Sequence, residues 1–141
     1  MSPAGGALVA LLALLAAALT GLYRRRRDGR VLPSGRASAD AAPSQQSQAL
    51  VALGVSPGRT TLVQFSSAFC APCRVARRVC ADVAAAMDVA HLEVDAESHL
   101  DEVRRLGIWR TPTVLVVDPA GRVTHRVTGP PARAELLAAI A

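Results

Sequence analysis

The chain has 141 residues and a formal net charge of +5 at pH 7. This length suits one compact domain with attached segments. The positive charge is local: six arginines fall between Arg24 and Arg36, whereas from Ala41 onward ten arginines stand against nine acidic residues. A nearly neutral domain argues against a nucleic-acid-binding surface, so we expect no nucleic acid among the partners.

An apolar run follows a short tail at residues 1–3. The run from Ala4 to Tyr23 holds twenty residues without a charge, and at about 1.5 Å per residue it spans the roughly 30 Å hydrocarbon core of a bilayer. Four arginines, Arg24 to Arg27, come directly after it, whereas a cleaved signal peptide carries positive charge before its apolar region. The sequence predicts a single-pass transmembrane helix over residues 4–23 in the cell membrane, with the rest of the chain in the cytoplasm.

Residues 24–43 are expected to form a basic juxtamembrane segment and a flexible linker. Turn-forming residues recur there without apolar periodicity, at Asp28-Gly29-Arg30, Pro33-Ser34-Gly35 and Ala42-Pro43-Ser44. We therefore expect the folded domain to occupy residues 44–141.

Helices and strands alternate along this domain. Apolar residues at every fourth position from Val75 to Met87 indicate an amphipathic helix, and the turn at Pro119-Ala120-Gly121 indicates a hairpin. Helices between strands predict an α/β fold with a mixed central sheet flanked by helices. The expected elements are a helix at 44–53, a strand at 60–65, a helix at 71–87, a strand at 89–95, a helix at 98–106, strands at 113–118 and 122–128, and a helix at 133–140.

Two cysteines stand where the first of these strands gives way to a helix, in the order Cys70-Ala71-Pro72-Cys73. The unpaired N–H groups and positive dipole of a helix N-terminus favour a thiolate at Cys70. Pro72 fits the first turn, where its missing N–H does no harm. Such a thiolate attacks a disulfide to form a mixed disulfide, and the thiol of Cys73 resolves it by closing the Cys70–Cys73 ring.

A second motif, Gly107-Ile108-Trp109-Arg110-Thr111-Pro112-Thr113, precedes a buried strand about forty residues downstream. Together with the Cys-x-Pro-Cys turn it resembles the thioredoxin family over residues 51–141. The resemblance implies a thioredoxin-like fold, a cis peptide bond at Pro112 and a substrate-contacting role for Thr111. An ordinary trans proline at the start of a strand is the alternative.

The resemblance also implies a substrate surface and partners. Phe69 and Ala71 are expected to contact the substrate beside the cysteines, and Trp109 is expected either to join an apolar docking patch or to pack. Because the dithiol is itself the redox centre, no cofactor and no metal are implied. The implied partners are proteins with disulfides and an electron donor of the thioredoxin-reductase type.

Two positions depart from the family pattern. Six residues before the first cysteine the family commonly has a buried Asp that accepts a proton from the resolving cysteine, and this chain has Gln64, which does not titrate. Where the family often has a Lys nearby, this chain has His91. We hypothesise that His91 assists proton transfer at Cys73, because imidazole titrates near neutrality; the alternative is an exposed histidine without a role.

The sequence thus predicts a membrane-anchored thiol:disulfide oxidoreductase that acts as a reductase. An exported protein that forms or reduces disulfides is one alternative, and a non-catalytic scaffold is another. A zinc-binding module is a third, with ligands from Cys70, Cys73, Cys80 and His91 or His99. Cys80 itself is interpreted as a small buried hydrophobe, with a regulatory thiol as the alternative.

Overall fold

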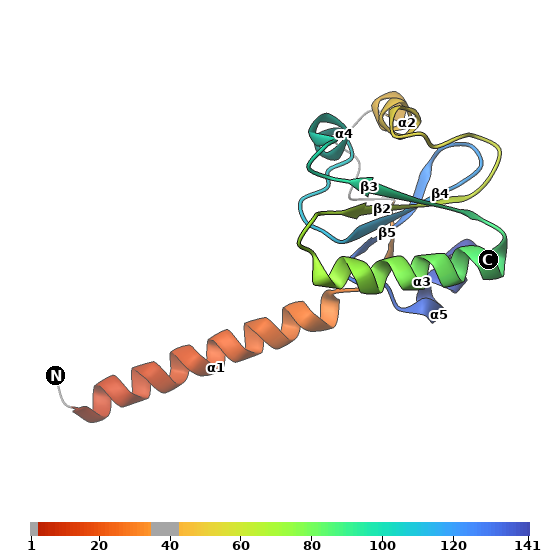
Figure 1. Cartoon of the computed structure of the whole chain (residues 1–141). Helices are drawn as coiled ribbons and strands as arrows, with labels where there is room; N and C mark the ends of the chain where they lie inside the picture. Colours follow the sequence, from red (N-terminus) through yellow and green to blue (C-terminus); the bar gives the residue numbers. More distant parts are fainter. Residues whose placement is uncertain (1–2, 35–42) are drawn as a thin grey trace.

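A computed structural model describes residues 3–34 and 43–141 of the chain. It contains a five-stranded mixed sheet in the order β1-β5-β4-β2-β3. Helices α2 and α4 cover one face of the sheet, and α3 and α5 cover the other (Figure 1). The elements are α1 (Pro3–Arg27), β1 (Val31–Pro33), α2 (Pro43–Ala52), β2 (Thr61–Ser66), α3 (Ala71–Met87), β3 (Ala90–Asp95), α4 (Leu100–Arg105), β4 (Thr113–Val117), β5 (Val123–Thr128) and α5 (Arg133–Ile140).

The central strand β2 is buried along its whole length, because both of its faces are covered by helices. Val63 and Phe65 belong to the apolar cluster under α2 and α4, and Leu62 belongs to the cluster under α3 and α5. Strand β2 runs parallel to β3 and antiparallel to β4. The predicted α/β fold with a mixed sheet between helices is therefore confirmed, as is the antiparallel hairpin of β4 and β5.

The first strand lies in the segment that we predicted to be a linker. Strand β1 pairs antiparallel with β5. The N–H of Gly29 donates to the carbonyl of Thr128 at 2.7 Å, and that of Ser34 donates to Thr124 at 2.8 Å. The linker prediction is wrong for residues 29–34, because the open edge of β5 offers backbone groups that an extended segment satisfies. Residues 35–42 of that linker lie outside the described residues.

The predicted N-terminal helix forms as α1 and projects away from the domain (Figure 1). Its leucines are exposed, from Leu8 to Leu22. Across residues 3–34 and 43–141, no helix meets the combined length and apolar content of a membrane span. The structure therefore does not support the transmembrane helix predicted for residues 4–23.

The residue directly after α1 is joined to the domain by an ion pair. The guanidinium of Arg110 bonds the carboxylate of Asp28, the residue directly after α1. Arg110 precedes Thr111 in the loop before β4. The junction between α1 and the sheet thus lies beside the Thr111-Pro112 motif.

Candidate active site

The two cysteines lie at the N-terminus of α3, next to the end of β2. Cys70 is the N-cap of the helix, and the N–H of Cys73 donates to its sulfur at 3.2 Å. Pro72 occupies the first turn, where no intrahelical bond is lost. Cys70 and Cys73 form a disulfide whose Cα atoms are 5.2 Å apart. In the reduced protein this helix end and the Cys73 N–H both favour a thiolate on Cys70.

The two sulfurs differ in their access to solvent. Cys70 is partly exposed, whereas Cys73 is only 2% exposed. The sulfur of Cys70 is therefore the more accessible of the two to a substrate. The roles of nucleophile and resolving cysteine stay predictions.

The Thr111-Pro112 motif lies against the cysteine turn. The peptide bond between Thr111 and Pro112 is cis, as the family resemblance implies. The hydroxyls of Ser67 and Thr111 lie 3.1 Å apart and share a hydrogen bond, and the N–H of Gly129 donates to the Pro112 carbonyl at 2.8 Å. The loop is thus held on both sides, and a substrate role for Thr111 and Pro112 stays a prediction.

The predicted substrate contacts around the cysteines are on the surface. Phe69 is fully exposed, and Trp109 is 92% exposed. Ala71 is also exposed, in the first turn of α3. Exposed aromatic rings contribute no packing to the core, so the packing alternative for Trp109 is wrong. The docking role of these residues stays a prediction.

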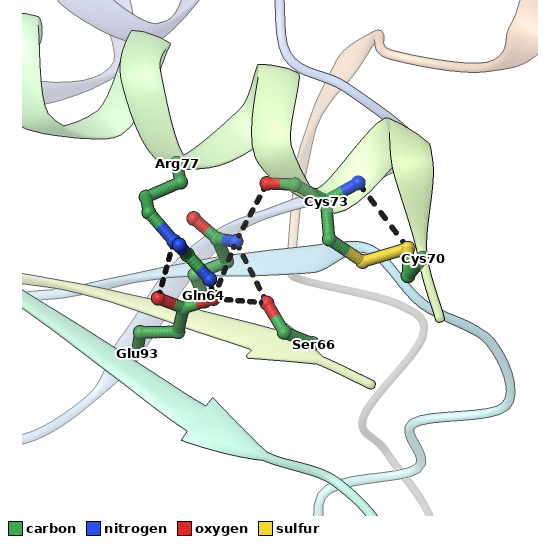
Figure 2. A network of polar contacts seen from close by, with 6 residues as sticks. All are labelled: Gln64, Ser66, Cys70, Cys73, Arg77 and Glu93. Carbon is green, nitrogen blue, oxygen red and sulfur yellow. Dashed lines mark hydrogen bonds and ion pairs between the residues drawn. A yellow bond between two sulfur atoms is a disulfide. The ribbon is translucent and has the colours of Figure 1, made fainter. Parts of the chain in front are cut away.

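A polar network that the sequence analysis missed lies beside Cys73 (Figure 2). The Gln64 side-chain amide donates to the Cys73 carbonyl at 3.1 Å and to the Ser66 hydroxyl at 2.8 Å. The Ser66 hydroxyl donates to the carboxylate of Glu93 at 2.7 Å. Arg77 of α3 forms an ion pair with the same carboxylate at 2.6 Å.

Glu93 lies beside Gln64 because β2 and β3 are parallel, with these two residues as Cα partners. Burial opposes ionisation of Glu93, but hydrogen bonds from Arg77 and Ser66, together with the charge of Arg77, outweigh it and hold the pKa below its usual value. The Glu93 carboxylate therefore lies beside Gln64, the position at which the family commonly has an Asp. The sequence did contain a signal for Glu93. Side chains alternate between the two faces of a strand, so Glu93, two residues after His91, lies on the same face of β3 as His91.

His91 lies on β3 and is half-buried. Burial lowers the pKa of its imidazole, the charge of Glu93 raises it, and Arg77 lowers it again. Its Nε2 is buried and has no hydrogen-bond partner in the described part of the chain. His91 is therefore not joined to the network that reaches Cys73, and its role in proton transfer stays a prediction.

The third cysteine is a core residue. Cys80 is fully buried in the cluster under α3 and α5. Burial, with a smaller effect from Glu93, raises the pKa of its thiol to about 12. Among the described residues, no group of three or more His, Cys, Asp or Glu side chains is arranged to hold a metal ion.

Comparisons with known proteins point to one family. The family model for thioredoxin matches residues 47–141. A search of curated proteins finds no match. Similar solved structures include a mutant thioredoxin from Halobacterium salinarum NRC-1, with 22% identity and a TM-score of 0.55 over 59% of this chain and 73% of that one.

Two further structures share the fold. Chloroplastic thioredoxin z is 22% identical, with a TM-score of 0.55 over 71% of this chain and 88% of that one. The thioredoxin pre-protein of Schistosoma mansoni is 18% identical, with a TM-score of 0.55 over 64% of this chain and 88% of that one. The match to the family model and the Cys70–Cys73 disulfide support thiol–disulfide exchange at these cysteines. This chain belongs to the thioredoxin family.

Proposed function

We propose that this protein is a thiol:disulfide oxidoreductase that reduces disulfides in protein substrates. The observation that carries the proposal is the Cys70–Cys73 disulfide at the N-terminus of α3, with the outer sulfur accessible and the inner one buried. A helix N-terminus stabilises the thiolate that begins the exchange.

The reaction has two exchange steps. The Cys70 thiolate attacks one sulfur of the substrate disulfide, and the other substrate sulfur leaves as a thiolate. Cys73 then loses its proton and attacks Cys70, which restores the Cys70–Cys73 disulfide and releases the second substrate thiol. The dithiol is oxidised as the substrate disulfide is reduced. No prosthetic group takes part in this scheme.

Substrate and donor are proposed from the surroundings of the disulfide. Thr111 and Pro112 hold the substrate chain, and Phe69, Ala71 and Trp109 contact it from the surface. The oxidised protein is then reduced again by a donor of the thioredoxin-reductase type. Support comes from the exposure of these contact residues and from the Ser67–Thr111 hydrogen bond that holds the loop beside the cysteines.

Cysteine variants test the chemistry. In the full chain, Cys70→Ser is expected to abolish reduction of a model protein disulfide, because it removes the attacking sulfur. Cys73→Ser is expected to accumulate a mixed disulfide between Cys70 and the substrate, visible by mass spectrometry. Cys80→Ser, which leaves both exchanging sulfurs in place, is the matched control. Turnover by the Cys70→Ser variant at the wild-type rate contradicts the proposal.

The reduction potential tests the direction. Equilibration against glutathione and dithiothreitol buffers is expected to give a value near the roughly −270 mV typical of thioredoxin. A value nearer the roughly −120 mV of a strong oxidant instead favours an exported protein that forms disulfides.

We also propose that the chain is attached to the cell membrane by its N-terminal helix, with the domain in the cytoplasm. The uncharged run from Ala4 to Tyr23, the arginines that follow it and the exposed leucines of α1 support this proposal. Fractionation of cells that express the full chain or the chain from residue 28 tests it. Recovery of the full chain outside the membrane fraction contradicts it.

A further inference from the structure

The resolving cysteine poses a chemical problem that the cysteines alone do not solve. Cys73 is 2% exposed, yet its thiol must lose a proton before its sulfur attacks, because the thiolate is the nucleophile. Burial favours the neutral thiol. A group that links this buried position to solvent is therefore needed, and Gln64 does not accept the proton because an amide does not titrate near neutrality.

The network beside Cys73 contains such a group. Gln64 holds the Cys73 carbonyl at 3.1 Å and the Ser66 hydroxyl at 2.8 Å, and Ser66 donates to Glu93 at 2.7 Å. The Glu93 side chain keeps 27% of its surface exposed. It therefore contacts both the interior network and water. Figure 2 shows Ser66 on the side of Glu93 that faces Cys73.

A pocket of about 380 Å³ opens at this point of the surface. It is large enough for water molecules and lined by polar groups that bind them. Its lining residues are Ser66, Ser67, Ala68, Arg77, Glu93 and Asp95.

We propose that Glu93 accepts the proton of Cys73 by way of the Ser66 hydroxyl during the resolving step. This proposal rests on the proposed function. The hydrogen bonds of the network reach Cys73 at its carbonyl. In this proposal the thiol proton of Cys73 passes to the nearby Ser66 hydroxyl as Ser66 gives its own proton to Glu93. Cys73 Sγ then bonds to Cys70 Sγ, the bond from Cys70 to the substrate sulfur breaks, and the substrate leaves with the electron pair as a thiolate. Glu93 returns the proton to solvent.

The charged and titratable groups around Glu93 limit how long it keeps a proton. Arg77 of α3 pairs with its carboxylate and holds its pKa below the usual value, so Glu93 takes up the proton only briefly before it passes to solvent. Cys80 of the same helix stays a neutral thiol. On β3, His91 and Asp95 share the face of Glu93, but Asp95 bonds Ser98 and the N–H of Glu97. Neither hydrogen bond of Asp95 leads toward Cys73.

The test separates the two exchange steps in the full chain. Glu93→Gln is expected to slow release of the second substrate thiol about tenfold or more at pH 7. The loss is expected to shrink as the pH rises toward 9, because hydroxide then takes the proton. The first step is followed alone in a Cys73→Ser background, and Glu93→Gln is expected to leave its rate unchanged there.

Matched variants complete the design. Ser66→Ala breaks the proton route but leaves the Glu93 carboxylate. It is therefore expected to slow the resolving step as much as Glu93→Gln does, with the same pH profile. If Glu93→Gln does not fold, Ser66→Ala still tests the proposal. Asp95→Asn removes an acid from the same pocket and is expected to behave as the wild type. If the wild type is active and both Glu93→Gln and Ser66→Ala keep its pH profile, the role of Glu93 is wrong but the proposed function stands. If His91→Asn slows the resolving step instead, that step depends on His91. An inactive wild type overturns the proposed function as well.

Discussion

At the scale of single residues, the surroundings of each sulfur decide its chemistry. Cys70 is partly exposed at a helix N-terminus, Cys73 is buried behind it, and Cys80 lies in the core. From the N-cap of α3 to its interior, the same side chain thus ranges from a proposed nucleophile to a buried apolar group. Position within α3 explains this range, because the dipole effect is confined to the first turn and burial dominates further along.

Cys80 is expected to stay unreactive in the folded protein. In the reduced full chain at pH 8, an alkylating reagent is expected to label Cys70 rapidly and Cys80 only after denaturation, because burial raises the pKa of the Cys80 thiol to about 12. Peptide mass mapping measures the labelling. Labelling of Cys80 at the rate of Cys70 contradicts its position in the core.

The same pKa predicts a loss of stability in alkali. The pKa of Cys80 in the folded protein lies above its ordinary value of 9.0. The neutral Cys80 thiol therefore makes its full contribution to the free energy of unfolding below about pH 9, and this contribution is lost as the pH rises toward 12. The free energy of unfolding of the wild type is expected to fall more steeply over this interval than that of Cys80→Ala. Parallel curves from chemical denaturation contradict this expectation.

The cysteine turn and the Thr111-Pro112 motif were predictable because each is a short, continuous stretch of sequence. Glu93 was not predicted, because its place beside Gln64 depends on the register between β2 and β3. A one-residue shift of register turns a side chain to the opposite face of the sheet. Sequence reasoning therefore found the residue types of the site but not the network that supports Cys73.

At the scale of elements, every helix and strand expected within residues 44–141 is present. Their apolar periodicity is local information and reports directly on which face is buried. Strand β1 escaped prediction, because three residues ending in Pro33 carry no alternating pattern. Its conformation comes from β5, with which it pairs, and from Glu135 of α5, whose carboxylate accepts from the Val31 N–H at 2.9 Å.

Removal of β1 is expected to weaken the domain. A chain that begins at residue 35 is expected to unfold with a free energy about 1–3 kcal/mol lower than one that begins at residue 28, since it loses several backbone hydrogen bonds along β5. The chain from residue 28 is the matched control, because it lacks α1 and keeps β1. Urea denaturation measures the difference. Equal stabilities contradict a structural role for β1.

At the scale of the whole molecule, two aromatic rings of the described domain, over residues 43–141, remain exposed although the domain is otherwise well packed. Phe69 directly precedes Cys70, and Trp109 lies in the loop that leads to Pro112. Both stretches lie at the same end of the strands, where β2 ends and β4 begins and where the hydroxyls of Ser67 and Thr111 share a hydrogen bond. An exposed aromatic side chain offers a large contact area to a partner protein.

Truncation of these rings is expected to affect large substrates selectively. Phe69→Ala and Trp109→Ala are each expected to raise KM for a protein disulfide about 5- to 30-fold, in line with about 1–2 kcal/mol per interface aromatic residue. The rate with a small-molecule disulfide is expected to stay the same, since such a substrate does not reach the rings. Steady-state kinetics with both substrates measures the contrast. Equal losses on both substrates contradict a docking role.

The direct join between α1 and the sheet, where Asp28 also pairs with Arg110, limits how far the active site can move from α1. A flexible linker over residues 24–43 would let the domain range about 25 Å from the end of α1. Because the chain instead joins the sheet directly after α1, through the bond from Gly29 to Thr128, the disulfide samples a much smaller volume. Under the proposed function, substrates that gather near α1 are expected to meet Cys70 at a high effective concentration, and those farther away to depend on diffusion.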